Sequence, residues 1–127
     1  MFSKEAFKLI IHSLPEVVAN PTNLEHWSRM QWGAYYSMAA LSNSSGGPAG
    51  AIAYYLSTNF NVPQGLGYGI GGTLYARLNH THGYYGYSEL FDVLNKRPKT
   101  NFDDKEKSNF VITTIEKILK NFEVSTN

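Results

Sequence analysis

The sequence contains no cysteine, few charged side chains and no long uninterrupted hydrophobic run. The lack of cysteine excludes a disulfide scaffold, a thiolate nucleophile, a zinc finger and an iron–sulfur cluster. Polar residues interrupt every apolar stretch well before the roughly 18 residues that a membrane span needs. Lys4, Glu5 and Lys8 lie among the first apolar residues, which is not the pattern of a signal peptide. We therefore expect a soluble, cytoplasmic protein.

Charge is sparse and unevenly distributed. Charged residues make up 17% of the chain, against about 25% in typical proteins. The net charge of +1 gives no basic surface for nucleic acid or a membrane. No charged residue lies between Gln31 and Ala76. This distribution predicts a buried middle between charged ends, and a surface that meets another chain.

The length of 127 residues favours a single domain over residues 1–127. Apolar residues recur at three- and four-residue steps, which predicts an all-α bundle of five or six helices. Five glycines between residues 64 and 78 oppose a helix there, each by about 1 kcal/mol. We nevertheless expect a helix, because Gly65, Gly69 and Gly72 share one face that would allow a close neighbour. The predicted helices cover residues 2–18, 24–41, 49–60, 64–78 and 84–94, with a last helix starting at Thr100 or Asn101.

Turn and capping residues mark several boundaries. Pro15 should kink or divide the first helix, because proline removes one hydrogen bond of the helix. Thr22 or Asn23 can cap the second helix, and Asp103 and Asp104 suit the first turn of the last. The expected inner-face residues are Phe7, Ile10, Ile11, Leu14 and Val18; Trp27, Met30, Gly33 or Ala34, Ser37 or Met38, and Leu41; Ile52, Ala53 and Leu56; and Val111, Ile115, Ile118, Leu119 and Phe122.

Two short motifs suggest chemistry. Residues 67–72 have the letters of the GxGxxG phosphate-binding loop, but no strand is predicted before them, so close helix packing explains them better. His80 and His82 form a second motif that can chelate a metal from a loop. Two residues apart, these histidines do not share a helical face, and no carboxylate lies near them before Glu89. They are a weak alternative metal site.

A longer pattern runs through the uncharged middle. Residues 47–65 read Gly-Pro-Ala-Gly-Ala-Ile-Ala-Tyr-Tyr-Leu-Ser-Thr-Asn-Phe-Asn-Val-Pro-Gln-Gly. This segment resembles the metal-site segment of iron-containing (group III) alcohol dehydrogenases, in which His-xxx-His is followed, after nine residues, by His-Gly. The similarity continues upstream to Met30 and downstream to Arg77-Leu-Asn79, and it covers roughly residues 5–95. It implies part of the helical, C-terminal metal domain of that family, with a dehydroquinate synthase-like fold.

The resemblance also implies where catalytic groups would lie. The two metal-binding histidines of this segment fall on Gly50 and Gln64, and the histidine beside the substrate falls on Tyr54. Glycine offers no donor atom, and an amide oxygen or a neutral phenol is a poor ligand for iron or zinc. The family's other two ligands and its dinucleotide-binding domain precede the matched segment, and we expect this chain to lack them. The family would imply Fe or Zn and NAD(P), but we expect no cofactor here.

We therefore expect a degenerate helical domain of this family, without dehydrogenase activity on its own. It would act as a structural, oligomeric or small-ligand-binding subunit, with Gly50, Tyr54, Gln64 and Gly65 as candidate ligand-binding residues. The alternative is one subunit of a split NAD(P)-dependent alcohol dehydrogenase. A separately encoded nucleotide-binding chain would then supply the missing ligands, and Tyr54 would be a candidate proton donor. The expected partner is thus a second copy or that nucleotide-binding subunit.

Overall fold

A computed structural model describes residues 1–94 and 101–122. Within these ranges the chain forms α-helices and one 3-10 helix, with no strand, so the predicted all-α class is confirmed. Contacts divide the chain into two compact units, Met1–Ser45 and Gly46–Asn127. The single domain over residues 1–127 stays a prediction. The described residues contain no helix long and apolar enough to cross a membrane. The elements are α1 (Phe2–Ala19), α2 (Leu24–Ser42), α3 (Pro48–Phe60), α4 (Gln64–Thr81), the 3-10 helix η1 (Gly86–Leu90), α5 (Phe91–Leu94) and α6 (Asp104–Asn121).

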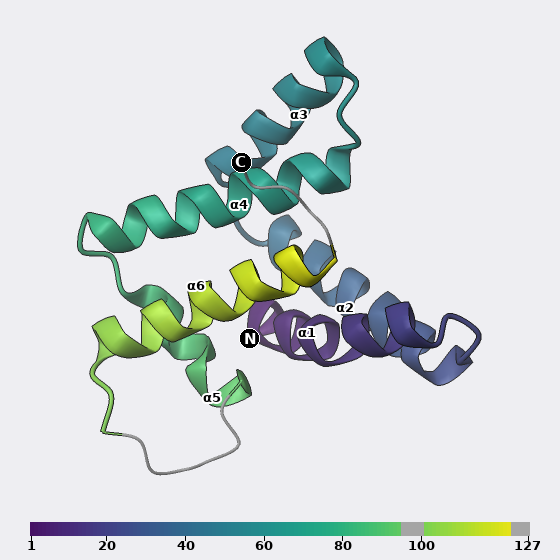
Figure 1. Cartoon of the computed structure of the whole chain (residues 1–127), viewed down its shortest axis with the longest axis horizontal. Coiled ribbons are helices and arrows are strands. Elements are labelled where there is room, and N and C mark those ends of the chain that lie inside the picture. The colour runs from purple at the N-terminus through teal and green to yellow at the C-terminus, as the bar shows by residue number, and fades with distance from the viewer. Residues whose placement is uncertain (95–100, 123–127) are drawn as a thin grey trace. The chain divides into compact units, whose positions relative to one another are not determined.

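The first unit is an antiparallel pair of helices, α1 and α2 (Figure 1). The side chain of Asn23 caps α2, accepting hydrogen bonds from the backbone N–H groups of Glu25 and His26 at 2.9 and 3.4 Å. Gly33 lets the helices approach closely, since a β-carbon there would lie 2.6 Å from Ile10 Cγ1. Helix α1 is assigned as one helix through Pro15, so the proline does not divide it.

The predicted inner faces of this unit are partly wrong. On α1 the buried valine is Val17, while Val18 is 54% exposed. On α2 only Gly33 is fully buried and Met30 is half-buried. The face that meets α1 has to include Gly33, because the closest approach is there, and this turns the other predicted residues toward solvent. The exposed residues of the predicted α2 face are Trp27, Ala34, Ser37, Met38 and Leu41.

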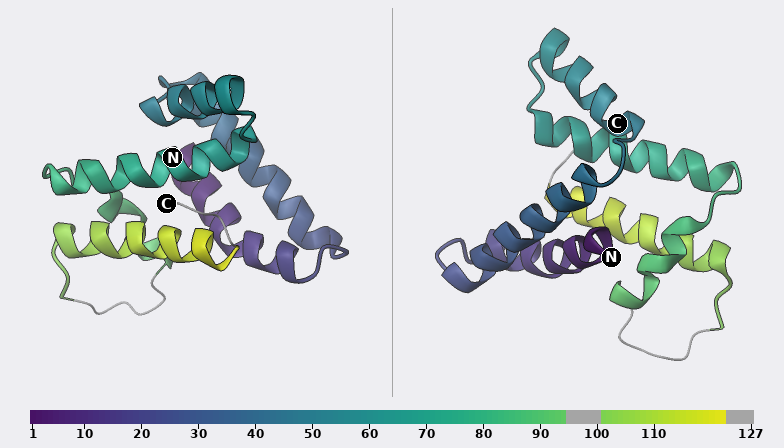
Figure 2. Two further views of the ribbon diagram at one scale, coloured as in Figure 1. Left: turned by 45° about the horizontal axis from the view of Figure 1, so that its top comes forward. Right: turned by 180° about the vertical axis from the view of Figure 1, so that it is seen from behind.

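The second unit contains an antiparallel hairpin, α3 and α4, and α6 packed against α4 and η1 (Figures 1 and 2). Its core is small, and two of its residues, Val111 and Ile112 on α6, are almost completely buried. The ring of Phe91 packs edge-on against Phe110, with centroids 5.3 Å apart. The remaining buried residues of this unit are Ala53, Gly67, Gly71, Thr73, Ala76, Phe91 and Ser108.

Two predicted elements of this unit begin or end elsewhere. Helix α6 starts at Asp104, because Asp103 caps it and exchanges hydrogen bonds with Glu106 in a capping box. The predicted starts were wrong: Asn101 precedes the cap, and Thr100 lies outside the described residues. The helix predicted over 84–94 is only the turn η1 followed by the short α5. Gly83, with φ of +91°, lies in the turn after α4, and regular structure resumes only at Gly86.

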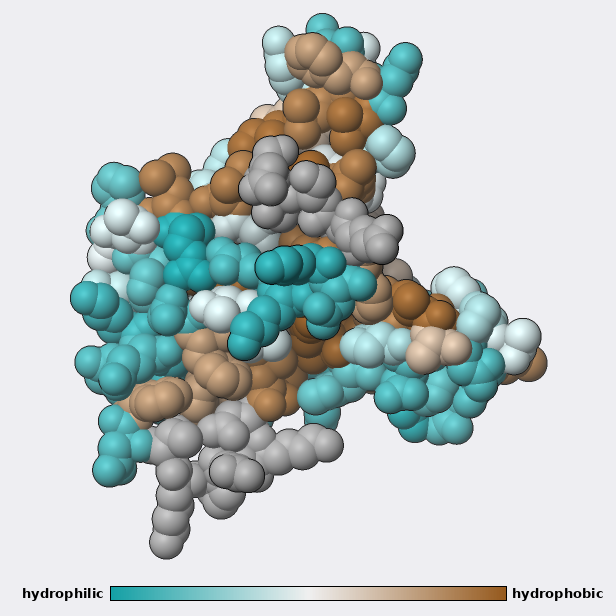
Figure 3. All heavy atoms as spheres, in the orientation of Figure 1, coloured by the Kyte–Doolittle hydropathy of each residue, from teal (hydrophilic) through white to brown (hydrophobic). Residues whose placement is uncertain are grey.

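The uncharged middle is not buried as the charge distribution predicted. Large aromatic residues within it are exposed, among them Trp32 at 55% and Tyr54 at 67%. Figure 3 shows hydrophobic residues gathered over α3, whereas the side chains over α6 are hydrophilic. Each helix of a two-helix hairpin buries only one face against its neighbour, so apolar side chains on the other faces stay accessible.

Candidate functional site

The glycines of α4 set how α3 and α4 pack. A β-carbon at Gly67 would lie 2.9 Å from the Ala53 α-carbon, and one at Gly71 would lie 3.2 Å from Ile52 Cγ2. The two helices therefore approach closely at these glycines, and at Gly67 the nearest atom belongs to the backbone of α3. The predicted glycine face was wrong: Gly65 and Gly72 face open space. Gly69 instead faces Leu119 of α6, 3.5 Å from its Cδ2.

The same packing explains the GxGxxG letters. Residues 67–72 lie inside α4, and Pro63, not a strand, precedes the helix. A phosphate-binding loop needs free backbone N–H groups at a helix start. The interior of α4 uses these groups in its own hydrogen bonds. Close helix packing, the explanation favoured by the sequence, therefore accounts for Gly67, Gly69 and Gly71, whereas Gly72 has no neighbour within 4 Å.

Four residues form what we call the hairpin face: Gly50 and Tyr54 on α3, and Gln64 and Tyr68 on α4. Each pair is four residues apart, so its members share one side of their helix. The Tyr68 hydroxyl of α4 lies close to Gly50 of α3, because a β-carbon built on Gly50 would be 3.0 Å from it. The hairpin face therefore contains all three positions that resemble the histidines of the dehydrogenase segment.

The loop between α3 and α4 determines where Gln64 lies. Asn61 ends α3 in the left-handed conformation, with φ of 53°, which asparagine tolerates better than most residues. Pro63 then precedes α4, and its carbonyl accepts a hydrogen bond from the Gly67 N–H at 3.0 Å. Gln64 is thus the first residue of α4 and is exposed.

The separation of Gly50 and Gln64 follows from the hairpin register. Gly67 lies opposite Ala53, so Gln64 lies near the level of Leu56, six residues beyond Gly50. At about 1.5 Å per residue, the two positions are about 9 Å apart along the helix axis. Tyr54 lies between these levels, with 67% of its surface exposed, and Tyr68 is 48% exposed. Gly65 is exposed and lies about a quarter turn around α4 from Gln64, away from the face.

The donor atoms of the hairpin face do not form the metal site that the resemblance implies. Gly50 contributes no side chain, and the Tyr68 hydroxyl occupies the space beside it. The remaining groups, an amide and two phenols, are neutral and bind iron or zinc poorly. These groups are instead suited to hydrogen bonds and ring contacts with an uncharged polar molecule. The hairpin face therefore does not fit the family's metal.

The two histidines at the end of α4 have local hydrogen-bonding partners. His80 Nδ1 lies 3.4 Å from the hydroxyl of buried Ser108, and its ring packs edge-on against Tyr85. His82 is exposed, with Nδ1 2.9 Å from the Leu78 carbonyl oxygen. Among residues 1–94 and 101–122, no group of three histidine or carboxylate side chains could hold a metal ion.

A polar cluster between α4 and α6 was missed by the sequence reasoning. Arg77 makes a bidentate salt bridge with Glu116, with nitrogen–oxygen distances of 3.0 and 2.9 Å. It also donates to Asn109 at 2.6 Å and to Thr113 at 3.3 Å. The partners are at least 32 residues away in the sequence, and the only signal for them was polar residues at four- and three-residue steps on α6. Arg77 therefore ties α4 to α6, and Asn79 reaches Tyr87 at 3.3 Å.

Comparisons with known proteins give one family. A search of curated proteins and a search of solved structures each found no significant match. The family model described as "Fe-containing alcohol dehydrogenase family, C-terminal" matches residues 1–127. The match extends the similarity seen in residues 5–95 to the entire sequence. On this match, the chain belongs to the Fe-containing alcohol dehydrogenase family and corresponds to its C-terminal, helical part.

Proposed function

We propose that this chain is a degenerate member of its family, a pseudoenzyme domain that does not bind a catalytic metal at the hairpin face. The observation that carries the proposal is the pairing of Gly50 with Tyr68: the first ligand position has no donor, and a phenol hydroxyl lies beside it. Hydride transfer in this family depends on a metal to polarise the alcohol oxygen. Without a metal at this face, the chain has no means of supplying that polarisation.

A structural, oligomeric or small-ligand-binding role accords with these features. Tyr54 and Tyr68 offer exposed rings and hydroxyl groups, and Gln64 offers an amide, all on one uncharged face. Such groups bind a small neutral molecule through stacking and hydrogen bonds. The exposed aromatic residues of the uncharged middle favour contact with another chain.

The alternative is a split NAD(P)-dependent alcohol dehydrogenase, completed by a nucleotide-binding chain. This hypothesis requires that the partner supply nearly the entire metal-binding shell, because Gly50 and Gln64 supply little of it. Tyr54 would be its candidate proton donor. The donor set disfavours this arrangement, and we therefore retain the degenerate domain as the proposed function.

The test is the metal affinity of the full chain carrying Gln64→His. One added imidazole cannot complete the shell, because Gly50 remains without a donor. We therefore expect no stoichiometric uptake of Fe²⁺ or Zn²⁺ by the wild type or by Gln64→His. Metal titration calorimetry on protein freed of any histidine tag measures this. Asn59→His, an exposed position on α3, is the matched control for an added surface imidazole. Tight binding of one metal per chain by Gln64→His, but not by Asn59→His, would refute the proposal.

A further inference from the structure

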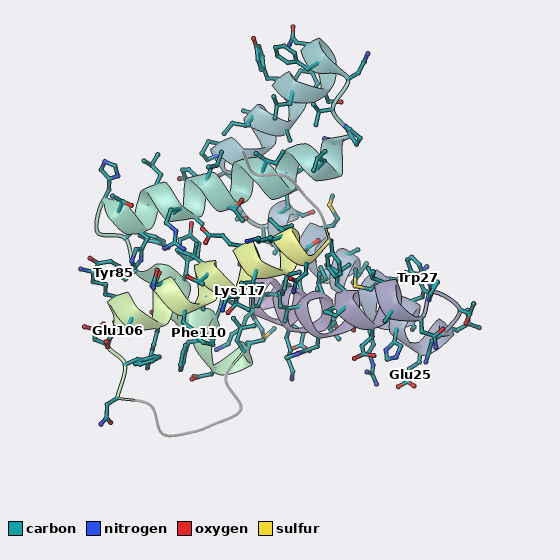
Figure 4. The ribbon with its side chains drawn as sticks, in the orientation of Figure 1. Glu25, Trp27, Tyr85, Glu106, Phe110 and Lys117 are labelled. Atoms are coloured by element: carbon teal, nitrogen blue, oxygen red, sulfur yellow. The ribbon has the colours of Figure 1, made fainter. Side chains whose placement is uncertain are left out.

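Helix α2 has a second apolar stripe, on the side that does not face α1. Its residues follow one another at alternating steps of three and four residues, and all of them are exposed. Among them, Leu24 is 82% and Met38 is 59% exposed. Figure 4 shows Trp27 beside the turn between α1 and α2. We call this stripe the α2 seam: Leu24, Trp27, Gln31, Ala34, Met38 and Leu41.

The spacing of the α2 seam indicates what kind of partner fits it. Steps of three and four residues give an average of 3.5 residues per turn, the period at which two helices stay in contact along their length. The seam extends over about 26 Å at 1.5 Å per residue. Gln31 is a single polar residue within it, and one such residue commonly sets the register of paired helices. The seam is therefore suited to another helix.

The charges around the seam favour a second copy as that helix. The positions flanking it on both sides are Asn23, Ser28, Met30, Tyr35, Ser37 and Ser42, and none of them is charged. In a symmetric pair the flanks of one seam meet the flanks of the other, so uncharged flanks bring no like charges together. The charged residues of α2, Glu25 and Arg29, form a salt bridge with each other away from the seam. Nothing along the α2 seam repels a second copy.

The area is also in the range of a small dimer interface. Trp27, Tyr35, Met38 and Leu41 are each about half exposed, with fractions of 43, 63, 59 and 46%. The Trp27 N–H already donates to the Pro21 carbonyl at 2.7 Å, so its exposed ring offers apolar surface without an unpaired donor. A fully buried aromatic side chain covers about 150–250 Å², and these side chains are about half exposed, so the seam and its flanks offer several hundred Å², less than the roughly 800 Å² per partner of a standard interface.

We propose that this protein forms a homodimer in which the α2 seam of one copy pairs with the α2 seam of the other. The proposal deepens the structural role given under the proposed function and rests on it. The proposed function and the homodimer can fail independently. Metal uptake would overturn the proposed function, whereas a protein without the dimer interface described here would still give the same metal result.

The first test is light scattering of the full chain and of Ala34→Glu across a concentration series. The wild type is expected to be a dimer. Ala34 is exposed within its own unit, so a glutamate there leaves the α1–α2 pair folded but places two like charges at the centre of the seam. We expect the dimer dissociation constant to rise by about 100-fold or more. Ser3→Glu adds the same charge at an exposed position on α1 and should leave the dimer unchanged.

A second test uses the absence of cysteine from the chain. Single cysteines introduced as Gln31→Cys, Ala34→Cys and Met38→Cys report which seam positions meet in the dimer. We expect at least one of them to form an intermolecular disulfide under mild oxidation, while Thr58→Cys, exposed on α3, does not. A monomeric wild type would overturn the proposal, because solvent or another part of the chain would then cover the seam. A dimer that Ala34→Glu does not weaken would also overturn it, by placing the interface elsewhere.

Discussion

Gly67→Ala is expected to destabilise the protein by about 2 kcal/mol, although alanine is the better helix former. The added methyl group would lie 2.9 Å from the Ala53 α-carbon and 3.2 Å from its β-carbon. The first of these atoms belongs to the backbone, so the clash cannot be relieved by a side-chain rotation. Helices α3 and α4 would have to separate, which disturbs the packing that forms the hairpin face.

Gly72→Ala is the matched control on the same helix. A β-carbon at Gly72 meets no atom within 4 Å, so the variant gains helix propensity without a clash. We expect it to stabilise the protein by about 0.5–1 kcal/mol. Chemical denaturation followed by circular dichroism compares the two variants with the wild type. Two changes of the same sign would contradict the close contact between α3 and α4.

Ile112→Ala is expected to destabilise the protein strongly, by about 3–4 kcal/mol. Ile112 is 1% exposed on α6, next to Val111, which is fully buried. Removing its larger side chain leaves a cavity in a core with few other large residues, so little can collapse into the space. Because this core holds α6 against α4, which carries half of the hairpin face, the variant should also weaken any ligand binding at that face.

Leu78→Ala provides the comparison for this truncation. Leu78 is a similar side chain on α4 but is 55% exposed, so its loss should cost under about 1 kcal/mol. Thermal unfolding measures both, and the melting temperature of Ile112→Ala should be about 10–20 °C below that of the wild type. Equal melting temperatures for the two variants would contradict the placement of Ile112 of α6 in the core of the second unit.

The sequence predicted the helices better than their faces. Helix α3 was located to within a residue, and Asn23 was one of two candidate caps for α2. The inner face of α2 was misassigned because two apolar stripes lie side by side on this helix. Periodicity finds both stripes, but only the approach of Gly33 to Ile10 decides which one meets α1.

The candidate site was located by spacing, and its chemistry needed the structure. The steps between Gly50, Tyr54 and Gln64 placed them in one family segment, but no pattern indicated that Tyr68 lies over Gly50. The contact between Arg77 and Glu116 could not be predicted from the sequence either, because residues 39 positions apart meet only through the packing of α4 on α6. Local patterns predict helices and loops, whereas contacts between helices depend on the register of each pair.

The most direct test of the central claim is the metal content and composition of the tagged protein isolated from its own cells. Native mass spectrometry with elemental analysis gives both in one preparation. A degenerate structural domain predicts an assembly of this chain alone, with far less than one iron or zinc per chain. Isolation of one tightly held metal per chain, or of a stable complex with a nucleotide-binding chain, would contradict the claim and favour the split dehydrogenase. Tyr54 and Gln64 would then be the first residues to mutate in activity assays.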